Sequence, residues 1–210
     1  RGFDIIDAYI EHTHPNTCDE STNFETWSYL SRVIQAEGIA EGAIAGRLHQ
    51  DHCSGTLVWQ LNDCWPTASW SSIDGHGRRK LLHYELKKAF APVLLHGRWL
   101  DGVPANHNST LRVGITANPG LFEGTVPGTL IVDIDNLQDY DIGSSRILNL
   151  SVTAGETTWI DLEDLLTESD IPNSTFIRLK WSIDDAGPKG DFYASDRVYC
   201  VVPGELDLKI

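Results

Sequence analysis

One stretch of the chain combines side chains that could bind a sugar. It runs from Trp59 to Asp74 and reads WQLNDCWPTASWSSID, with three tryptophans among amide, hydroxyl and carboxylate groups. Indole rings offer flat apolar faces to the C–H groups of a sugar ring, while amides and carboxylates bond to its hydroxyls. The same composition suits tryptophans that fill a core beneath a loop of turn-forming residues. The residues alone leave both interpretations open.

The elements predicted around this stretch are a helix, a strand and a second helix. Residues 22–25 (TNFE) fit a capping box, and apolar residues at helical spacing follow them. Residues 56–61 (TLVWQL) form a short, mostly apolar run typical of a strand covered on both faces in a parallel sheet. The second helix is predicted over residues 82–90, before Pro92. A lone strand with two helices cannot cover itself on both faces, so we expect further strands from a longer polypeptide.

Beyond about residue 95 the hydrophobic period changes to two. Alternating runs cover residues 111–116, 130–134, 148–152, 177–183 and 198–202, and turn residues separate them. Short alternating strands with this punctuation predict an antiparallel β-sandwich of roughly a hundred residues.

Composition excludes two classes of partner. The chain has 210 residues and a formal net charge of −14, which repels phosphate backbones and anionic lipid. We therefore expect no nucleic-acid partner. No stretch approaches the roughly 20 apolar residues that a membrane-spanning helix needs, so we expect no membrane partner.

Cysteines and glycosylation sequons predict a secreted, extracellular glycoprotein. The four cysteines (Cys18, Cys53, Cys64 and Cys200) are even in number, as is typical where disulfide bonds form, and three pairings are possible. Asparagine acceptors for N-glycans are predicted at Asn108, Asn149 and Asn173. Asn149 falls on the polar phase of its predicted strand, where a glycan is tolerated.

The residues around the tryptophans resemble the end of the catalytic barrel in family-2 β-mannosidases. The resemblance rests on the run from Trp59 to Asp74, on KLLHY at residues 80–84 and on FAPV at residues 90–93. Residues 29–37 and Arg47 also match, so the close match covers about residues 27–93. In the second half, residues 194–199 resemble the closing strand of the immunoglobulin-like domain that follows the barrel.

This resemblance implies an α/β plus all-β chain. Residues 1–95 would form the last helix–strand–helix of a (β/α)8 TIM barrel, and residues 96–210 an immunoglobulin-like β-sandwich. By the family's pattern, Trp59 would contact the sugar, Asn62 and Asp63 would line or support the pocket, and Trp65 would shape its wall together with Trp70.

The resemblance also implies that both catalytic glutamates lie outside this chain. Retaining glycosidases use two carboxyl groups, a nucleophile and an acid/base, and the family's motifs for both are missing here. Glu37 and Glu41 lie one helical turn apart and are interpreted as a solvated face. Asp74 and Glu85 suit turn or capping roles, and His83 suits packing. We predict no cofactor and no metal site, because neither His49, His52 and Cys53 nor His12 and His14 have a complete ligand set.

The predicted function is therefore that of an exo-acting retaining β-mannosidase, with an upstream segment of the same enzyme completing the barrel. Its substrate would be a β-mannoside oligosaccharide. Two alternatives stay open: a related exo-β-glucosaminidase or galactosidase, and a non-catalytic carbohydrate-binding module. Because Trp181 lies on the apolar phase of its strand, we expect it in the core and expect the sandwich to act as a structural spacer.

Overall fold

The computed structural model describes residues 2–15, 23–102, 108–136, 142–166, 175–183 and 193–200. The chain divides into two units. The first unit comprises residues 1–47 and 53–90, and the second comprises residues 48–52 and 91–210. The structure combines helices with antiparallel β-sheets.

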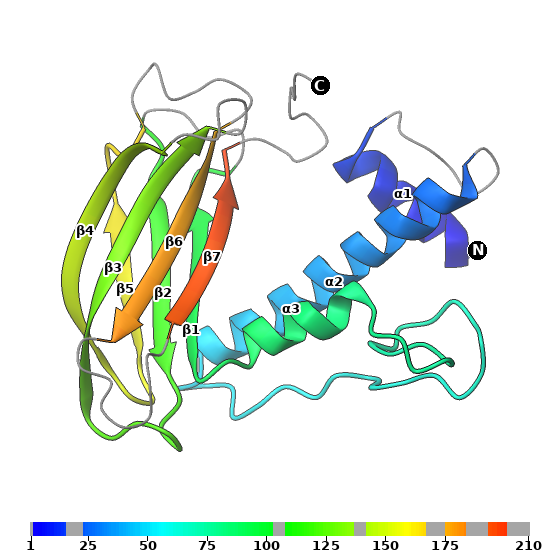
Figure 1. Ribbon diagram of the computed structural model, residues 1–210, viewed down its shortest axis with the longest axis horizontal. Helices are drawn as coiled ribbons and strands as arrows, with labels where there is room; N and C mark the ends of the chain where they lie inside the picture. The colour runs from blue at the N-terminus through cyan, green and yellow to red at the C-terminus, as the bar shows by residue number, and fades with distance from the viewer. Residues whose placement is uncertain are drawn as a thin grey trace. The chain divides into compact units, whose positions relative to one another are not determined.

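The described residues of the first part of the chain form the helices α1 (Gly2–Thr13), α2 (Phe24–Leu48) and α3 (Leu81–Ala89) (Figure 1). The predicted α2 is confirmed, but its first turn is capped differently from the prediction. The side-chain oxygen of Asn23 accepts a hydrogen bond from Thr26 N at 3.2 Å, while Thr22 lies outside the described residues. An asparagine at this position satisfies an amide that has no partner within the helix.

A small apolar cluster joins α1 to α2 within the first unit. Ile10, Trp27 and Leu30 are buried together, and Trp27 Nε1 donates to Asp7 Oδ1 at 2.5 Å. The pairing explains why α2 shows apolar residues at helical spacing. The helix α1 was not anticipated from the sequence.

The strand predicted over residues 56–61 is not formed in the structure. The run is irregular, and Leu57 is fully exposed. Among the described residues its end is bonded, through Gln60 O and Leu61 O, which accept from Ser72 N and Ile73 N. A strand of a parallel sheet requires at least one neighbouring strand to pair with, and the described residues do not pair this run with any.

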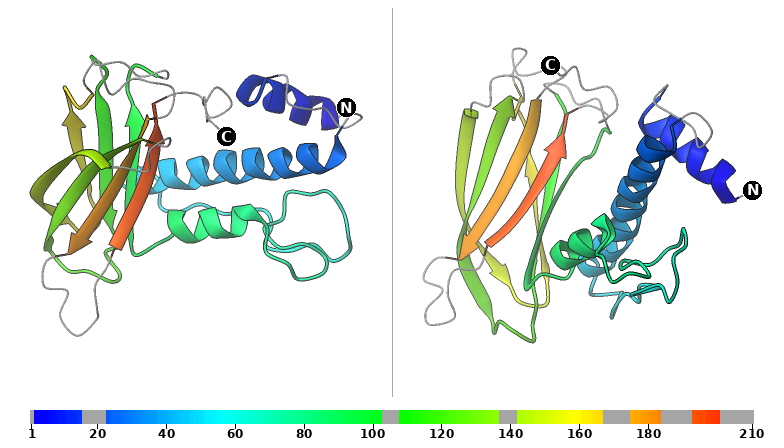
Figure 2. Two further views of the ribbon diagram at one scale, coloured as in Figure 1. Left: turned by 45° about the horizontal axis from the view of Figure 1, so that its top comes forward. Right: turned by 45° about the vertical axis from the view of Figure 1, so that its right-hand side comes forward.

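The second unit contains two antiparallel sheets, which lie face to face in the views of Figure 2. The three-stranded sheet has the order β1 (Val93–Trp99), β2 (Leu111–Ala117) and β5 (Thr157–Leu162). The four-stranded sheet has the order β4 (Ile142–Thr153), β3 (Thr125–Asn136), β6 (Thr175–Ile183) and β7 (Tyr193–Tyr199). Four of the five predicted alternating runs fall within β2, β3, β4 and β6. The fifth is displaced, because β7 ends at Tyr199 and residues 201–210 lie outside the described residues.

One shared core holds the two sheets together. It contains alternating residues of both sheets, including Val113, Ile115, Leu130, Leu179 and Trp181. Two glycines allow the close packing that this core needs. A Cβ atom on Gly97 would lie 2.6 Å from Leu179 Cδ1, and one on Gly128 would lie 2.5 Å from Trp181 Cζ2. No L side chain fits at either position without displacing its neighbours.

Candidate functional site

Residues 59–80, called the tryptophan loop below, fold back on themselves through backbone hydrogen bonds. Asp63 N donates to Ile73 O at 2.9 Å, and Ile73 N donates to Leu61 O at 2.9 Å. Lys80 N then donates to Ser72 O at 2.9 Å. These bonds bring the end of the loop next to its beginning, so the loop has a defined shape although it contains no named strand.

A buried carboxylate lies at the centre of the loop. Asp63 Oδ1 accepts a hydrogen bond from Ser69 Oγ, and Asp63 Oδ2 accepts one from Ser71 Oγ, each at 2.6 Å. Lys80 Nζ lies 3.3 Å from Asp63 Oδ2 and donates to Ser71 Oγ at 2.9 Å. We call Asp63, Ser69, Ser71 and Lys80 the Asp63 cluster. Both carboxylate oxygens have charged or hydroxyl partners, as a buried carboxylate requires.

The Asp63 cluster keeps its carboxylate ionised. Hydrogen bonds from Ser69 and then from Ser71 hold the pKa of Asp63 below its ordinary value, and Lys80 adds to this effect, although burial opposes it. The ionised carboxylate of Asp63 accepts hydrogen bonds from two hydroxyl groups at once. These bonds stabilise the charge of Asp63, and they also hold the loop in its folded shape.

Three indole rings stand out from this loop. The exposed fractions of Trp59, Trp65 and Trp70 are 75%, 65% and 56%. Asn62 is also exposed, and its amide donates to Asp63 O at 3.2 Å. Trp59, Asn62 and Trp65 thus lie at the surface of this chain, whereas the carboxylate of Asp63 is engaged within the loop.

The backbone of Trp65 is held by a close approach to Gly75. A Cβ atom at Gly75 would lie 2.5 Å from the carbonyl carbon of Trp65 and 2.8 Å from Pro66 N. Real Cβ atoms do not approach backbone atoms so closely. Glycine at position 75 therefore allows the two limbs of the loop to touch behind the exposed indole of Trp65.

A second carboxylate closes the turn at residues 74–78. Asp74 Oδ1 accepts from His76 N and Arg78 N, each at 2.9 Å, and Asp74 Oδ2 accepts from Arg78 Nε at 2.7 Å. These bonds, of which the one from Arg78 N is the largest cause, lower the pKa of Asp74 to about 2. The predicted turn role of Asp74 agrees with this geometry.

This lowered pKa predicts a pH-dependent effect of Asp74→Asn. A carboxylate whose pKa falls on folding stabilises the protein above its unfolded pKa, near 4, and the contribution is lost as the pH falls toward about 2. The substitution should therefore lower the urea midpoint of unfolding at pH 7, and its deficit relative to wild type should shrink between about pH 4 and pH 3. A deficit that is the same at both ends of this range would contradict the prediction.

The acidic pair on α2 behaves as a solvated face. Glu37 and Glu41 are both exposed. The pKa of Glu37 is raised above its ordinary value. The largest cause is burial of part of its side chain, and the negative charges of Glu85 and Glu41 add to it. His83 packs its ring edge-on against Tyr84 and has Nδ1 3.4 Å from Ser72 Oγ, in keeping with a packing role. Among the described residues no group of three His, Cys, Asp or Glu side chains could hold a metal ion.

The predicted disulfide bonds do not form among the described cysteines. Cys53, Cys64 and Cys200 are not joined to one another, and Cys18 lies outside the described residues. The difference arises because an even number of cysteines does not bring any two of them to bonding distance. Asn108 and Asn149 are exposed, while Asn173 lies outside the described residues. In the part of the chain that is described, no helix is long and apolar enough to cross a membrane.

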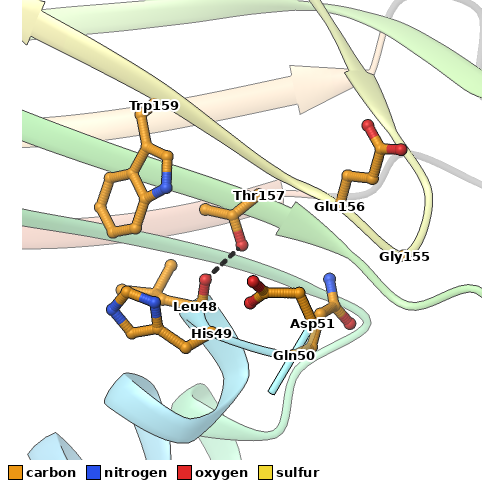
Figure 3. Close-up of a pocket in the computed structure, with 8 residues that line it drawn as sticks. All are labelled: Leu48, His49, Gln50, Asp51, Gly155, Glu156, Thr157 and Trp159. Atoms are coloured by element: carbon orange, nitrogen blue, oxygen red, sulfur yellow. Dashed lines mark hydrogen bonds between the residues drawn. The ribbon is translucent and has the colours of Figure 1, made fainter. Parts of the chain in front are cut away.

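A hollow of about 250 Å³ in the second unit was missed by the sequence reasoning (Figure 3). Its lining residues come from the end of α2 and the turn after it, and from the turn before β5 and the start of β5: Leu48, His49, Gln50, Asp51, Gly155, Glu156, Thr157 and Trp159. Figure 3 shows the Thr157 hydroxyl pointing at Leu48 O, to which it donates at 2.7 Å. Gln50 Nε2 donates to Thr116 Oγ1 at 2.5 Å. Several polar groups of the hollow are thus engaged in fixing the turn to the sheet.

Comparison with curated proteins gives partial matches to β-mannosidases. No protein family model matches the chain. Beta-mannosidase B of Aspergillus niger is 42% identical over 76 residues, which are 35% of this chain and 9% of that protein. Beta-mannosidase B of Emericella nidulans is 38% identical over 78 residues, 36% of this chain and 9% of that protein. The matched region thus spans about a tenth of the length of these relatives.

Comparison with solved structures shows the same fold over most of the chain. The β-D-mannosidase of Dictyoglomus thermophilum matches 98% of this chain and 23% of its own, with a TM-score of 0.74 and 19% identity. The exo-chitosanase CsxA of Amycolatopsis orientalis matches 93% of this chain and 21% of its own, with a TM-score of 0.64 and 15% identity. The sequence matches and the shared fold together confirm the predicted resemblance of this chain to the carboxy-terminal part of family-2 β-mannosidases.

Proposed function

We propose that this chain supplies, through the tryptophan loop, part of the sugar pocket of an exo-acting, retaining β-mannosidase. In this proposal the first unit is the end of a TIM barrel, and the second unit is an immunoglobulin-like domain that acts as a spacer. The two catalytic glutamates come from an upstream segment of the same enzyme. Terminal β-linked mannose is the sugar that the pocket releases.

The observation that carries this proposal is the exposure of three indole rings on a loop with a fixed shape. Trp59, Trp65 and Trp70 offer three flat apolar faces on the surface of this chain, where they are open to a sugar ring or to the rest of the enzyme. The Asp63 cluster and Gly75 hold the loop that carries them. Such a preformed aromatic surface with adjacent amide groups suits a sugar ring.

The choice of sugar requires a direct test. The fold is shared with both a mannosidase and an exo-chitosanase, so an exo-β-glucosaminidase or galactosidase is the alternative. The intact enzyme that contains this chain should release the chromophore from an aryl β-mannoside faster than from the matching glucosaminide or galactoside. Proton NMR of the first product should show retained β configuration. Release from another aryl glycoside without release from the mannoside would overturn the sugar assignment.

A binding-module role for the sandwich has less support. Trp181, the aromatic residue considered for it, is completely buried in the core, as expected from its place on the apolar phase. Trp159 is partly exposed and lines the hollow, but one edge of its indole packs at Gly114. We therefore favour a spacer role over a binding-module role for the second unit.

We also propose that the protein is secreted and glycosylated. The side chain of Asn149 is exposed on β4, which is an edge strand. Its Oδ1 accepts a hydrogen bond from Thr129 Oγ1 at 3.2 Å. This bond uses the amide oxygen and not the amide nitrogen to which a glycan would be attached. Protein from the natural source should lose mass when treated with an endoglycosidase that removes N-glycans. An unchanged mass would contradict this proposal.

A further inference from the structure

The sandwich has two open sides, where edge strands of different sheets lie next to each other. β1 and β7 meet at one side, and β4 and β5 meet at the other. Among the described residues neither pair is joined by a backbone ladder. At each side a charged side chain of one sheet bonds instead to backbone in, or directly after, the facing edge strand.

Asp196, on β7, makes this bond at the first side. Its Oδ2 accepts a hydrogen bond from Gly97 N of β1 at 2.8 Å, and His96 Nδ1 lies 3.2 Å from the same oxygen. Trp99 Nε1, also on β1, donates to Tyr199 O of β7 at 2.9 Å. An amide of the edge strand β1 therefore has its partner in the other sheet, through a carboxylate and not through a ladder.

Arg146, on β4, makes the bonds at the second side. Its guanidinium donates to Glu163 O at 3.2 Å and also to Asp164 O, the two carbonyls that directly follow β5. Asp164 has a φ of 50°, in the left-handed region that residues other than glycine rarely adopt. The next two residues, Leu165 and Leu166, are buried in the sandwich core. Arg146 therefore holds the turn that leads these leucines into the core.

We propose that Asp196 and Arg146 are two sheet clasps, each of which keeps one open side of the sandwich closed. Loss of one clasp leaves a backbone amide or two carbonyls without their partner, so that side opens locally to let water bond to them. The opposite side stays closed, because its own clasp and the shared core are intact. This inference concerns the second unit alone and does not rest on the glycosidase function.

An ion pair within one sheet supplies the matched control. Arg112 of β2 and Asp161 of β5 form two hydrogen bonds of 2.7 Å between neighbouring strands. Arg112→Ala removes charge-assisted bonds, as the clasp variants do, but it breaks no link between the two sheets. We expect this variant to open neither side.

Hydrogen exchange of the intact enzyme, resolved to peptides by mass spectrometry, tests the proposal. Asp196→Ala should speed exchange of the β1 and β7 amides about tenfold, and leave residues 163–166 within about twofold of wild type. Arg146→Ala should speed exchange of residues 163–166 about tenfold and leave β1 and β7 within about twofold. Arg112→Ala should leave both sets of amides within about twofold.

Trp99→Phe covers the case in which Asp196→Ala does not fold. It removes the bond to Tyr199 O while keeping an aromatic ring, and it should speed exchange at the β1–β7 side only. Equal acceleration at both sides by a clasp variant would overturn the proposal, because it would show a contribution to global stability alone. Unchanged exchange in the clasp variants, or an Arg112→Ala effect as large as theirs, would overturn it as well.

Discussion

Replacing Trp181 by alanine is expected to lower the free energy of unfolding by about 3 kcal/mol. Trp181 lies on β6, is completely buried, and packs where Gly128 leaves space for its ring. Truncation of a buried Trp costs roughly 3–5 kcal/mol, because contacts are lost and a cavity remains. Trp181 Nε1 has no hydrogen-bond partner among the described residues. Removing this buried donor therefore removes a desolvation cost of about 1 kcal/mol, so we expect the loss of stability at the lower end of the range for a buried Trp.

Urea unfolding followed by far-ultraviolet circular dichroism measures this effect without relying on tryptophan emission. The matched control is Trp159→Ala on β5 of the other sheet, where the indole is 40% exposed. We expect its loss to stay below about 1.5 kcal/mol, since less area leaves water on folding. Equal losses for the two variants would show that Trp181 is not the centre of the sandwich core.

The sandwich strands could be predicted where one face is buried and the other is not. β3 and β6 alternate in burial along Leu130, Val132 and Ile134 and along Ile177, Leu179 and Trp181, and the period of two is visible in the sequence. β1 was missed because Val93, Leu94 and Leu95 are all buried, which removes the alternation. β5 was missed because its first residues are polar and half-exposed.

The location of the candidate site could be predicted from the residue types, but its internal bonds could not. Three tryptophans near amide groups indicate the loop, and their rings are exposed on this chain. That Lys80 meets Asp63, 17 positions earlier in the chain, depends on how the loop folds back. Hydroxyl partners such as Ser69 and Ser71 carry no pattern in a sequence, because serine also fits any exposed turn.

Replacing Trp59 by alanine in the intact enzyme is expected to lower kcat/KM for an aryl β-mannoside by roughly 50- to 100-fold. Stacking about 100 Å² of indole on a sugar ring at about 25 cal/mol per Å² gives about 2.5 kcal/mol, which corresponds to this factor. In this chain alone the free energy of unfolding should change little, because the ring is 75% exposed there. Trp159→Ala, a partly exposed indole outside the loop, should leave kcat/KM within about twofold of wild type.

The contrast between Trp59 and Trp70 separates their roles in the proposed pocket. Trp59 begins the loop, whereas Trp70 lies between the two serines that Asp63 holds. If Trp59 contacts the sugar that is cleaved, its contact strengthens as the ring distorts, so Trp59→Ala should lower kcat as well as raise KM. A change in KM alone would mean that Trp59 binds substrate and transition state equally, and an unchanged kcat/KM would remove it from the pocket.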